Sequence, residues 1–453
     1  MKHLVVLGAG RSTTALIQYI CEQRQHYDWK VTVADASAQT IAILQQQYPT
    51  IEVQQLDVLN EEARNDIIEQ ADLVISMLPA RFHIHVVHSC LALQKNLITA
   101  SYVSDDVKEL RADIEEKGLL FLYECGLDPG LDHMSAMKAI DSIKVQGGIV
   151  TSFQSSCGGL MAPGSDDNPW RYKFTWNPRN VVLAGKFGTA QYLFKGRYKN
   201  IPHHHVFKRL SAVEVPGYGR FESYPNRDSL KYRDLYGIHD AETILRGTLR
   251  RPGFCAAWNA FVQLGLTDDS YEVRNLENMT YADFVRAYLP YSEDSLVTNF
   301  SRYIGTDVTS ELMDRITWLG LLEEKPIGMT KASPADVLQK LLEEKWQTQP
   351  QDEDMIVMQH LIGHQLNGED QLTTSSLAVT GQLNQLSGMA KTVGYPLGIA
   401  AKLILTNQVP LTGLAIPVHQ EIYRPILKEL ETLGISFVET THSLTPVLGG
   451  EIS

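Results

Sequence analysis

The sequence predicts an α/β protein that begins with a Rossmann fold, a doubly wound parallel sheet, and continues as an α+β domain with a helical subdomain. Three observations support this prediction. Short apolar runs alternate with amphipathic stretches through residues 1–130, and a glycine-rich turn follows the first run. From about residue 146 the alternation ends, and residues 276–346 then show the apolar spacing of helices.

Six strands and five helices are expected in the first part. The strands are largely apolar and lie at residues 3–10, 30–37, 51–58, 71–79, 96–103 and 119–130. Stretches with helical spacing separate them, at residues 13–23, 38–47, 61–70, 84–94 and 104–118. Strands that are apolar on both faces and separated by helices form a parallel sheet covered on both sides. Six strands in this alternation are typical of a dinucleotide-binding domain.

The turn "GAGRSTT" places Gly8 and Gly10 between the first strand and the first helix. Glycine permits the tight turn, and its missing side chain lets a pyrophosphate approach the N-terminus of the helix. Thr13 departs from the pattern, because a glycine or alanine is expected there for close packing of helix on strand.

Asp35, at the end of the second strand, bears on the choice of cofactor. A carboxylate at this place accepts hydrogen bonds from the ribose hydroxyls and repels a 2′-phosphate, so NAD is predicted in preference to NADP. The competing interpretation is that Asp35 or Ser37 caps the following helix.

A charged corner ends the sixth strand, in "LYECGLDPGLDHMSA" at residues 122–136. In open α/β sheets ligands bind at the carboxyl edge, so Asp128 and Tyr102, which ends the fifth strand, are expected to face the nicotinamide. Asp128 is alternatively a turn residue before Pro129. Asp132 and His133 are expected mainly to cap and orient the next helix.

The rest of the chain is more varied. Residues 147–159 have strand character, 221–232 are expected as a loop, 347–354 as a polar connector and 373–381 as a short strand. Tyr172, Phe174 and Trp176 alternate as in a strand, and packing in the core is expected of them. Helices are expected at 281–289, 296–304, 310–324 and 334–346, and an apolar helix at 388–405 is expected to cover either the core of the first domain or a homodimer interface.

These elements predict two domains. The dinucleotide-binding domain is expected to comprise residues 1–130 and about 386–453. Residues 131–385 are expected to form the substrate-binding domain, with its helical subdomain at about 270–346.

Composition excludes several classes of partner. A net charge of −13 argues against nucleic acid. No apolar run is long enough to span a membrane, and no signal peptide is recognised, so a cytoplasmic protein is expected. Five cysteines without CxxC spacing predict neither disulfides nor zinc. The histidines at 203–205 are expected in an exposed loop, and no metal is predicted.

Several segments together resemble one family, saccharopine dehydrogenase of the L-glutamate-forming type, also called saccharopine reductase. They are "SYVS", "GLDPGLDHM", "CGGLMAPGSDDNPWRYKFTW", "YPNRDS", "RGTLR" and "GMAKTVG", which run through almost the whole chain. Met161 and Gly164 depart from the family's usual proline and glutamate, which leaves the shape of that loop open.

The resemblance implies a reversible oxidation in lysine metabolism. Saccharopine, a secondary amine, would give a hydride to the nicotinamide of NAD, with NADP as the second candidate cofactor. The resulting imine would be hydrolysed to glutamate and 2-aminoadipate 6-semialdehyde. Because the substrate carries three carboxylates, guanidinium groups are suited to bind it, and Arg227 is the first candidate.

The expected site residues fall into three sets. The acid–base candidates are Tyr102, Asp128 and Cys157, and Cys157 is alternatively a small buried residue. Substrate contacts are expected from Ser101, Tyr102, Asp128, Arg227, Thr248, Leu249 and Arg250. Cofactor contacts are expected from Gly8, Gly10, Arg11, Ser12, Asp35, Asp57, Val58, Ser76, Leu127 and Trp176.

Two alternatives stay open. One is a related imine reductase or amine dehydrogenase, such as carboxynorspermidine dehydrogenase or lysine 6-dehydrogenase, although the long insertion with "YPNRDS" and "RGTLR" speaks against it. The other is a non-catalytic NAD-binding sensor, which would not need the cluster of arginines and carboxylates. The residues by themselves predict only a nicotinamide-dependent oxidoreductase with an anionic substrate.

Overall fold

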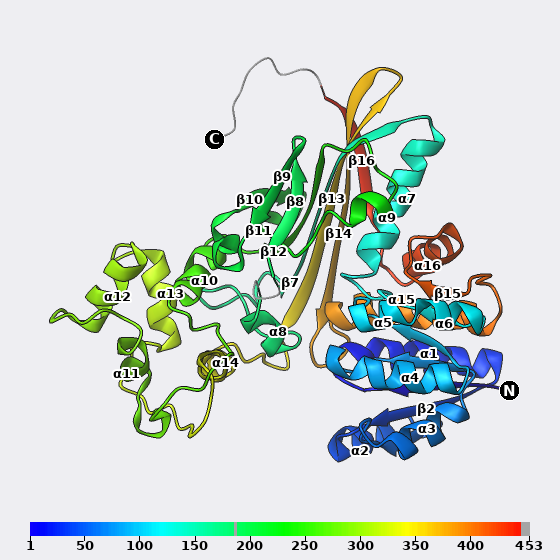
Figure 1. Ribbon diagram of the computed structural model, residues 1–453, viewed down its shortest axis with the longest axis horizontal. Helices are drawn as coiled ribbons and strands as arrows, with labels where there is room; N and C mark the ends of the chain where they lie inside the picture. The colour runs from blue at the N-terminus through cyan, green and yellow to red at the C-terminus, as the bar shows by residue number, and fades with distance from the viewer. Residues whose placement is uncertain (185–187, 445–453) are drawn as a thin grey trace. The chain divides into compact units, whose positions relative to one another are not determined.

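The computed structural model describes residues 1–184 and 188–444 (Figure 1). The chain forms two compact units, the first of Met1–Gly148 with Val379–Glu439 and the second of Ile149–Ala378 with the residues from Thr440. The first unit extends past the boundary expected at residue 130, because α7 (Leu131–Val145) is largely buried and packs against α16 (Gln420–Thr432). The expected end of the first domain, 445–453, lies outside the described residues.

Among the described residues, seven parallel strands form the sheet of the first unit, in the order β15-β6-β5-β4-β1-β2-β3. The six predicted strands are β1 (Lys2–Leu7), β2 (Trp29–Asp35), β3 (Glu52–Gln55), β4 (Leu73–Ser76), β5 (Asn96–Thr99) and β6 (Leu120–Leu122). Their order is that of a dinucleotide-binding sheet, which confirms the predicted fold. The seventh strand, β15 (Gly413–Ala415), was not predicted and pairs with β6.

The helices of the first unit follow the predicted alternation. They are α1 (Thr14–Tyr27), after a short 3-10 turn at Arg11–Thr13, α2 (Ala38–Gln47), α3 (Glu61–Glu69) and α4 (His83–Ala92). The single helix expected at 104–118 is instead two, α5 (Asp105–Glu109) and α6 (Arg111–Glu116). They break at Leu110, whose ψ of 2° is not helical.

The apolar helix α15 (Gly388–Leu405) packs against α1 within the first unit. Two glycines allow the close approach, because a Cβ on Gly394 would lie 2.5 Å from the backbone nitrogen of Leu16 and one on Gly398 would lie 2.5 Å from the ring of Tyr19. Of the two predicted roles for this segment, the structure therefore shows the cover over the core.

The second unit contains a nine-stranded mixed sheet within the described part of the chain. Seven strands run in the order β10-β11-β12-β7-β13-β14-β16, and β8 pairs with β12 and β9. At the centre, β12 runs parallel to β7 and β13 runs antiparallel to it. The strands are β7 (Ile149–Met161), β8 (Ala190–Phe194), β9 (Arg197–Ile201), β10 (Ser211–Val215), β11 (Gly219–Pro225), β12 (Thr243–Arg250), β13 (Glu353–Leu366), β14 (Glu369–Gln382) and β16 (Val438–Ser443).

Several local predictions for this unit were wrong. The expected loop at 221–232 begins as β11, because its first residues pair with β12, and it later contains α9 (Tyr232–Leu235). The polar connector at 347–354 runs into β13. Residues 170–176 form no strand, whereas the core packing expected of Tyr172 and Phe174 is confirmed. The histidines at 203–205 lie on an exposed 3-10 helix, His203–Lys208.

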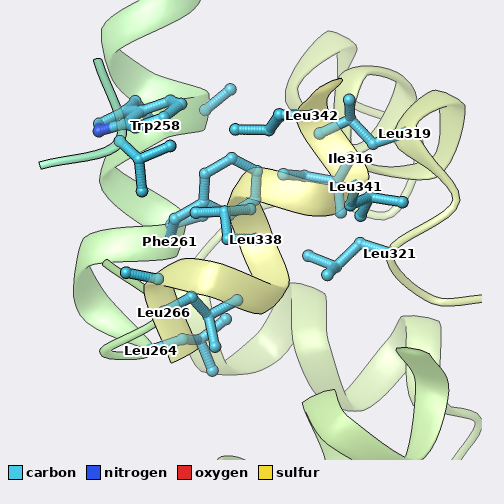
Figure 2. Close-up of a cluster of buried hydrophobic side chains, with 14 of the residues drawn as sticks. Trp258, Phe261, Leu264, Leu266, Ile316, Leu319, Leu321, Leu338, Leu341 and Leu342 are labelled. Carbon is cyan, nitrogen blue, oxygen red and sulfur yellow. The ribbon is translucent and has the colours of Figure 1, made fainter. Parts of the chain in front are cut away.

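The predicted helical segments are confirmed as α11 (Tyr281–Arg286), α12 (Leu296–Ile304), α13 (Glu311–Leu319) and α14 (Pro334–Lys345). Their apolar faces join α10 (Phe254–Gln263) in one buried cluster. Figure 2 shows Phe261 of α10 beside Leu338 and Leu341 of α14. The remaining helix of this unit is α8 (Pro178–Val182). No described helix combines the length and apolarity that crossing a membrane requires.

Candidate active site

The glycine turn after β1 has the geometry that a dinucleotide site needs. Gly8 has a φ of 96°, and a Cβ there would lie 2.9 Å from the backbone carbonyl of Met77. Only glycine fits at that position. Gly10 is less constrained by its own backbone, since a Cβ would meet nothing within 4 Å. It leads into the turn that contains Arg11 and Ser12, which lies at the N-terminus of α1.

Asp35 is held rigidly beside this turn. Its Oδ2 accepts a hydrogen bond from the backbone N–H of Ala9 at 2.8 Å, and its Oδ1 accepts one from the N–H of Ser37 at 2.8 Å. The capping role belongs to Ser37, whose hydroxyl accepts the N–H of Thr40. Asp35 therefore ties the end of β2 to the glycine turn, with its carboxylate fixed at the carboxyl edge of the sheet.

The other cofactor residues expected in the first unit are spread along the same edge. Asp57 and Val58 follow β3, where Asp57 Oδ1 accepts the N–H of Leu59, and Ser76 ends β4. Leu127 lies in the corner after β6. Trp176 belongs to the second unit, where it is half-buried against the aromatic cluster, and its contact with a cofactor stays a prediction.

The charged corner brings Tyr102 and Asp128 together, as its sequence suggests. The hydroxyl of Tyr102 donates to Asp128 Oδ1 at 2.9 Å, and both side chains are half-buried. The peptide bond between Asp128 and Pro129 is cis. The chain then folds back on itself so closely that the N–H of Gly126 donates to the carbonyl of Pro129.

A buried polar cluster lies behind this corner. The side chain of Glu124 faces His133, with Oε2 2.8 Å from Nε2, and its Oε1 accepts the N–H of Val103 at 3.2 Å. Asp132 Oδ1 accepts the N–H of Gly130 at 2.6 Å. Asp132 and His133 thus hold the start of α7, and Glu124, which the sequence interpretation missed, joins the corner to the residue after Tyr102.

We expect Gly130→Ala to destabilise the protein strongly. Gly130 has a φ of 147°, and a Cβ there would lie 2.1 Å from the carbonyl oxygen of Gly126, so the backbone must move. A loss of about 3 kcal/mol or more in the free energy of unfolding is expected from denaturant titration. Gly147→Ala, after the other end of α7, is the control: its φ is 84° but a Cβ meets nothing within 4 Å, so about 1–2 kcal/mol is expected. Equal losses would contradict the steric argument.

A second group of expected site residues meets on one face of the sheet in the second unit. Thr248 of β12 pairs with Cys157 of β7 on one side and with Tyr224 of β11 on the other. Arg250 follows Thr248 by two residues and so projects from the same face. The side chain of Leu249 projects from the opposite face into an apolar cluster with Leu160 and others, so only its backbone belongs to this group.

Arg250 is a buried cation that has no counter-ion among the described residues. Its side chain is 4% exposed, and its guanidinium carbon lies 5.2 Å from the ring centroids of Tyr172 and Phe254 and 5.8 Å from that of Tyr224. One Nη1–H donates to the carbonyl of Leu249, whereas Nε has no partner, and no carboxylate of the described chain forms an ion pair with it. A buried charge normally has a partner, so this arrangement favours binding of an anion.

Two other arginines near this group differ in exposure: Arg227 is exposed, whereas Arg246 is buried. Arg227 lines a shallow surface cleft with Tyr224, Pro225 and Asn226. Arg246 donates to the hydroxyl of Tyr232 and covers its ring, so it supports the fold. Tyr224 was assigned to a loop from the sequence, yet it is buried, and this burial raises the pKa of its phenol and keeps the hydroxyl protonated.

Comparison with known families places these features in context. Residues 4–122 match the family model of the saccharopine dehydrogenase NADP binding domain, and residues 126–435 match that of the saccharopine dehydrogenase C-terminal domain. The chain belongs to the saccharopine dehydrogenase family. The family predicted from the sequence motifs is therefore confirmed.

Members of the saccharopine dehydrogenase family are similar to this chain over nearly its whole length. The NADP-dependent, L-glutamate-forming saccharopine dehydrogenase of Saccharomyces cerevisiae is 34% identical over 97% of this chain and 99% of its own length. A solved apo structure of the L-glutamate-forming enzyme from that yeast has a TM-score of 0.87, with 32% identity, over 98% of this chain and 100% of that one. The mitochondrial α-aminoadipic semialdehyde synthase of Mus musculus is 36% identical over 96% of this chain. The chain spans about half the length of that protein, 47%.

Proposed function

We propose that this protein is an L-glutamate-forming saccharopine dehydrogenase of lysine metabolism. The observation that carries the proposal is the buried guanidinium of Arg250, which lacks a counter-ion in the described chain and lies beside Thr248 and Cys157. Saccharopine has three carboxylates, and one of them would neutralise this charge. Family membership over nearly the whole length supports the same substrate, and the yeast relative is named for this reaction.

The reaction divides into steps with different needs. A bound nicotinamide would supply the acceptor for the hydride that leaves the carbon that becomes the aldehyde. Before that, the secondary amine must lose its extra proton, and afterwards water adds to the imine, which breaks into glutamate and 2-aminoadipate 6-semialdehyde. Arg250 binds one carboxylate of the substrate, and the exposed Arg227 binds another by a bidentate contact.

Asp128 is the best candidate among the three acid–base residues. Carboxylic acids are ordinarily ionised at neutral pH, whereas thiols and phenols must first lose a proton before they can act as bases. The proton of Tyr102 is donated to Asp128, which fixes the carboxylate in place. In this proposal Asp128 pairs with the protonated secondary amine of saccharopine and accepts its extra proton.

The cofactor is a nicotinamide dinucleotide, and we propose NAD in preference to NADP. The support is Asp35, whose carboxylate is fixed by two backbone N–H groups where it would accept ribose hydroxyls and repel a 2′-phosphate. The fungal relatives are named for NADP, so this proposal separates the chain from them. It is wrong if kcat/KM of the wild-type protein favours NADP by tenfold or more.

Asp35→Asn is expected to lower kcat/KM for NAD by about 10- to 100-fold and to narrow the preference over NADP, because a charged acceptor for the ribose is lost. Asparagine keeps one acceptor for the N–H of Ala9, which limits damage to the turn. Asp72→Asn is a matched control, since Asp72 also accepts a backbone N–H, that of His3, but lies before β4 at the opposite edge of the sheet. Steady-state rates with both dinucleotides check this. An unchanged preference in Asp35→Asn would contradict the assigned role.

The decisive assay follows nicotinamide absorbance when the purified protein is mixed with saccharopine and NAD or NADP. Release of glutamate in equal amount to the reduced cofactor confirms the reaction. Turnover of carboxynorspermidine or lysine instead would assign the related dehydrogenases, and cofactor binding with no turnover would favour the sensor. A cytoplasmic location and a homodimer stay predictions.

A further inference from the structure

A chain of three buried or half-buried side chains crosses the carboxyl edge of the first unit's sheet. Ser76 is the last residue of β4, His83 is the first residue of α4, and Ser101 follows the end of β5. The Oγ of Ser76 lies 2.8 Å from Nδ1 of His83, and the Oγ of Ser101 lies 2.7 Å from Nε2. His83 therefore bridges a serine expected to contact the cofactor and a serine expected to contact the substrate.

The hydrogen-bond direction along this chain follows from burial. Ser76 is completely buried. Within the described chain, its hydroxyl forms a hydrogen bond with the ring of His83. If Ser76 accepted a proton from Nδ1–H, its own O–H would be left without an acceptor, which is costly in a buried site. Ser76 must therefore donate to Nδ1. The ring proton then resides on Nε2 and is donated to Ser101.

His83 can keep this arrangement because it stays neutral. Its side chain is 4% exposed, its two partners are uncharged hydroxyls, and burial lowers its pKa to about 4. A neutral imidazole has one N–H donor and one acceptor nitrogen. The tautomer fixed by Ser76 therefore decides whether Nε2 donates a hydrogen bond to Ser101 or accepts one from it. Ser101 accepts from His83, and its own O–H is left to donate outward from a half-buried position.

We propose that His83 is a positioning residue that leaves the O–H of Ser101 directed to donate a hydrogen bond to a carboxylate oxygen of the bound substrate. A donor held in this way favours an anionic group, whereas the ammonium group is matched by Asp128 nearby in the same unit. The identity of the ligand rests on the proposed function. The tautomer does not, and it can be tested without any ligand.

The first test measures the tautomer directly. Long-range ¹H–¹⁵N spectra of histidine-labelled protein would identify His83 among the 14 histidines by the signals lost in His83→Leu. A neutral ring protonated at Nε2 is expected at neutral pH. In Ser76→Ala, where the donor to Nδ1 is gone, the Nδ1-protonated form is expected to appear. A wild-type ring protonated at Nδ1, or at both nitrogens, would overturn the proposal.

The second test is a double-mutant cycle on the Kd for saccharopine, measured by calorimetry in the presence of reduced cofactor, which cannot accept a hydride from saccharopine. His83→Leu and Ser101→Ala are each expected to weaken binding by about 10- to 100-fold. In the double variant binding should be within about twofold of Ser101→Ala, because His83 acts only through that hydroxyl. His88→Leu, an exposed histidine on the same helix, should leave Kd unchanged.

Additive losses in the cycle would show that His83 only supports the fold, and would overturn the proposal. If His83→Leu does not fold, His83→Phe takes its place in the cycle, with the same expectation of no further loss in the Ser101→Ala background. If wild-type protein does not bind saccharopine, the proposed function fails, whereas the tautomer measurement still decides the hydrogen-bond direction.

Discussion

Arg250→Met is expected to lower kcat/KM for saccharopine by about 30- to 4,000-fold while leaving the protein as stable as wild type or more so. Loss of one partner from a buried charge pair costs about 2–5 kcal/mol of binding, which gives this range. Stability should not fall, because the unliganded protein already buries this cation without a carboxylate partner in the described chain. Replacing buried charges by apolar residues of similar volume is often neutral or stabilising.

The two measurements separate a binding role from a structural one. Contacts of the guanidinium with Tyr172, Phe254 and Tyr224 are worth about 0.5–2 kcal/mol, which limits the gain in stability on substitution. Thermal unfolding and steady-state kinetics should be compared with Arg197→Met, an exposed arginine of β9 in the same unit. A large loss of stability in Arg250→Met with little loss of kcat/KM would show that the cation serves the fold instead.

The doubly wound sheet could be predicted because its strands are apolar on both faces and its helices are amphipathic. Elements that carry a weaker pattern were missed. β15 has only three residues, and the strands β8 to β10 are short and half-exposed. None of these four strands therefore shows a clear alternation of apolar and polar residues. β13 was missed although it is apolar, because it begins within a run of acidic and amide residues that is typical of a connector.

The candidate site was predictable where a residue's chemistry depends on its place along a strand. Tyr102 and Asp128 follow neighbouring strands at the same edge of the sheet, so they were expected to meet. The role of His83 depends instead on how close the start of α4 lies to the ends of β4 and β5, which places His83 between Ser76 and Ser101. From the sequence, His83 was not assigned a role in the site. A histidine seven residues after a strand-ending serine is the signal that was available.

Glu124 is a second residue whose place in the site could not be predicted from the sequence pattern. An acidic residue at the end of an apolar strand is expected to project outward, yet Glu124 adopts a φ of 55° and is buried against His133. The positive φ turns its side chain beneath the corner, and no periodic pattern reports such a turn. The residues that hold a site in place are therefore harder to predict than the residues that it presents.

Asp128→Asn is expected to lower kcat for saccharopine oxidation by about 10²- to 10⁴-fold, the usual contribution of a general base. The amide can still accept the hydroxyl proton of Tyr102, so the corner should keep its shape. Tyr102→Phe removes only the hydrogen bond that orients Asp128 and is expected to cost about tenfold or less. Cys157→Ser keeps the volume of a buried side chain beside Thr248 and should also cost less than tenfold.

The three variants distinguish the acid–base candidates because each leaves the other two groups unchanged. If Asp128 accepts the proton, Asp128→Ala should regain part of its activity when formate is added, since a small carboxylate can occupy the vacated place. A loss in Tyr102→Phe larger than that in Asp128→Asn would assign the proton transfer to the phenol. Because Tyr102 donates to Asp128, the double variant should be no worse than Asp128→Asn alone if the tyrosine acts only through the carboxylate.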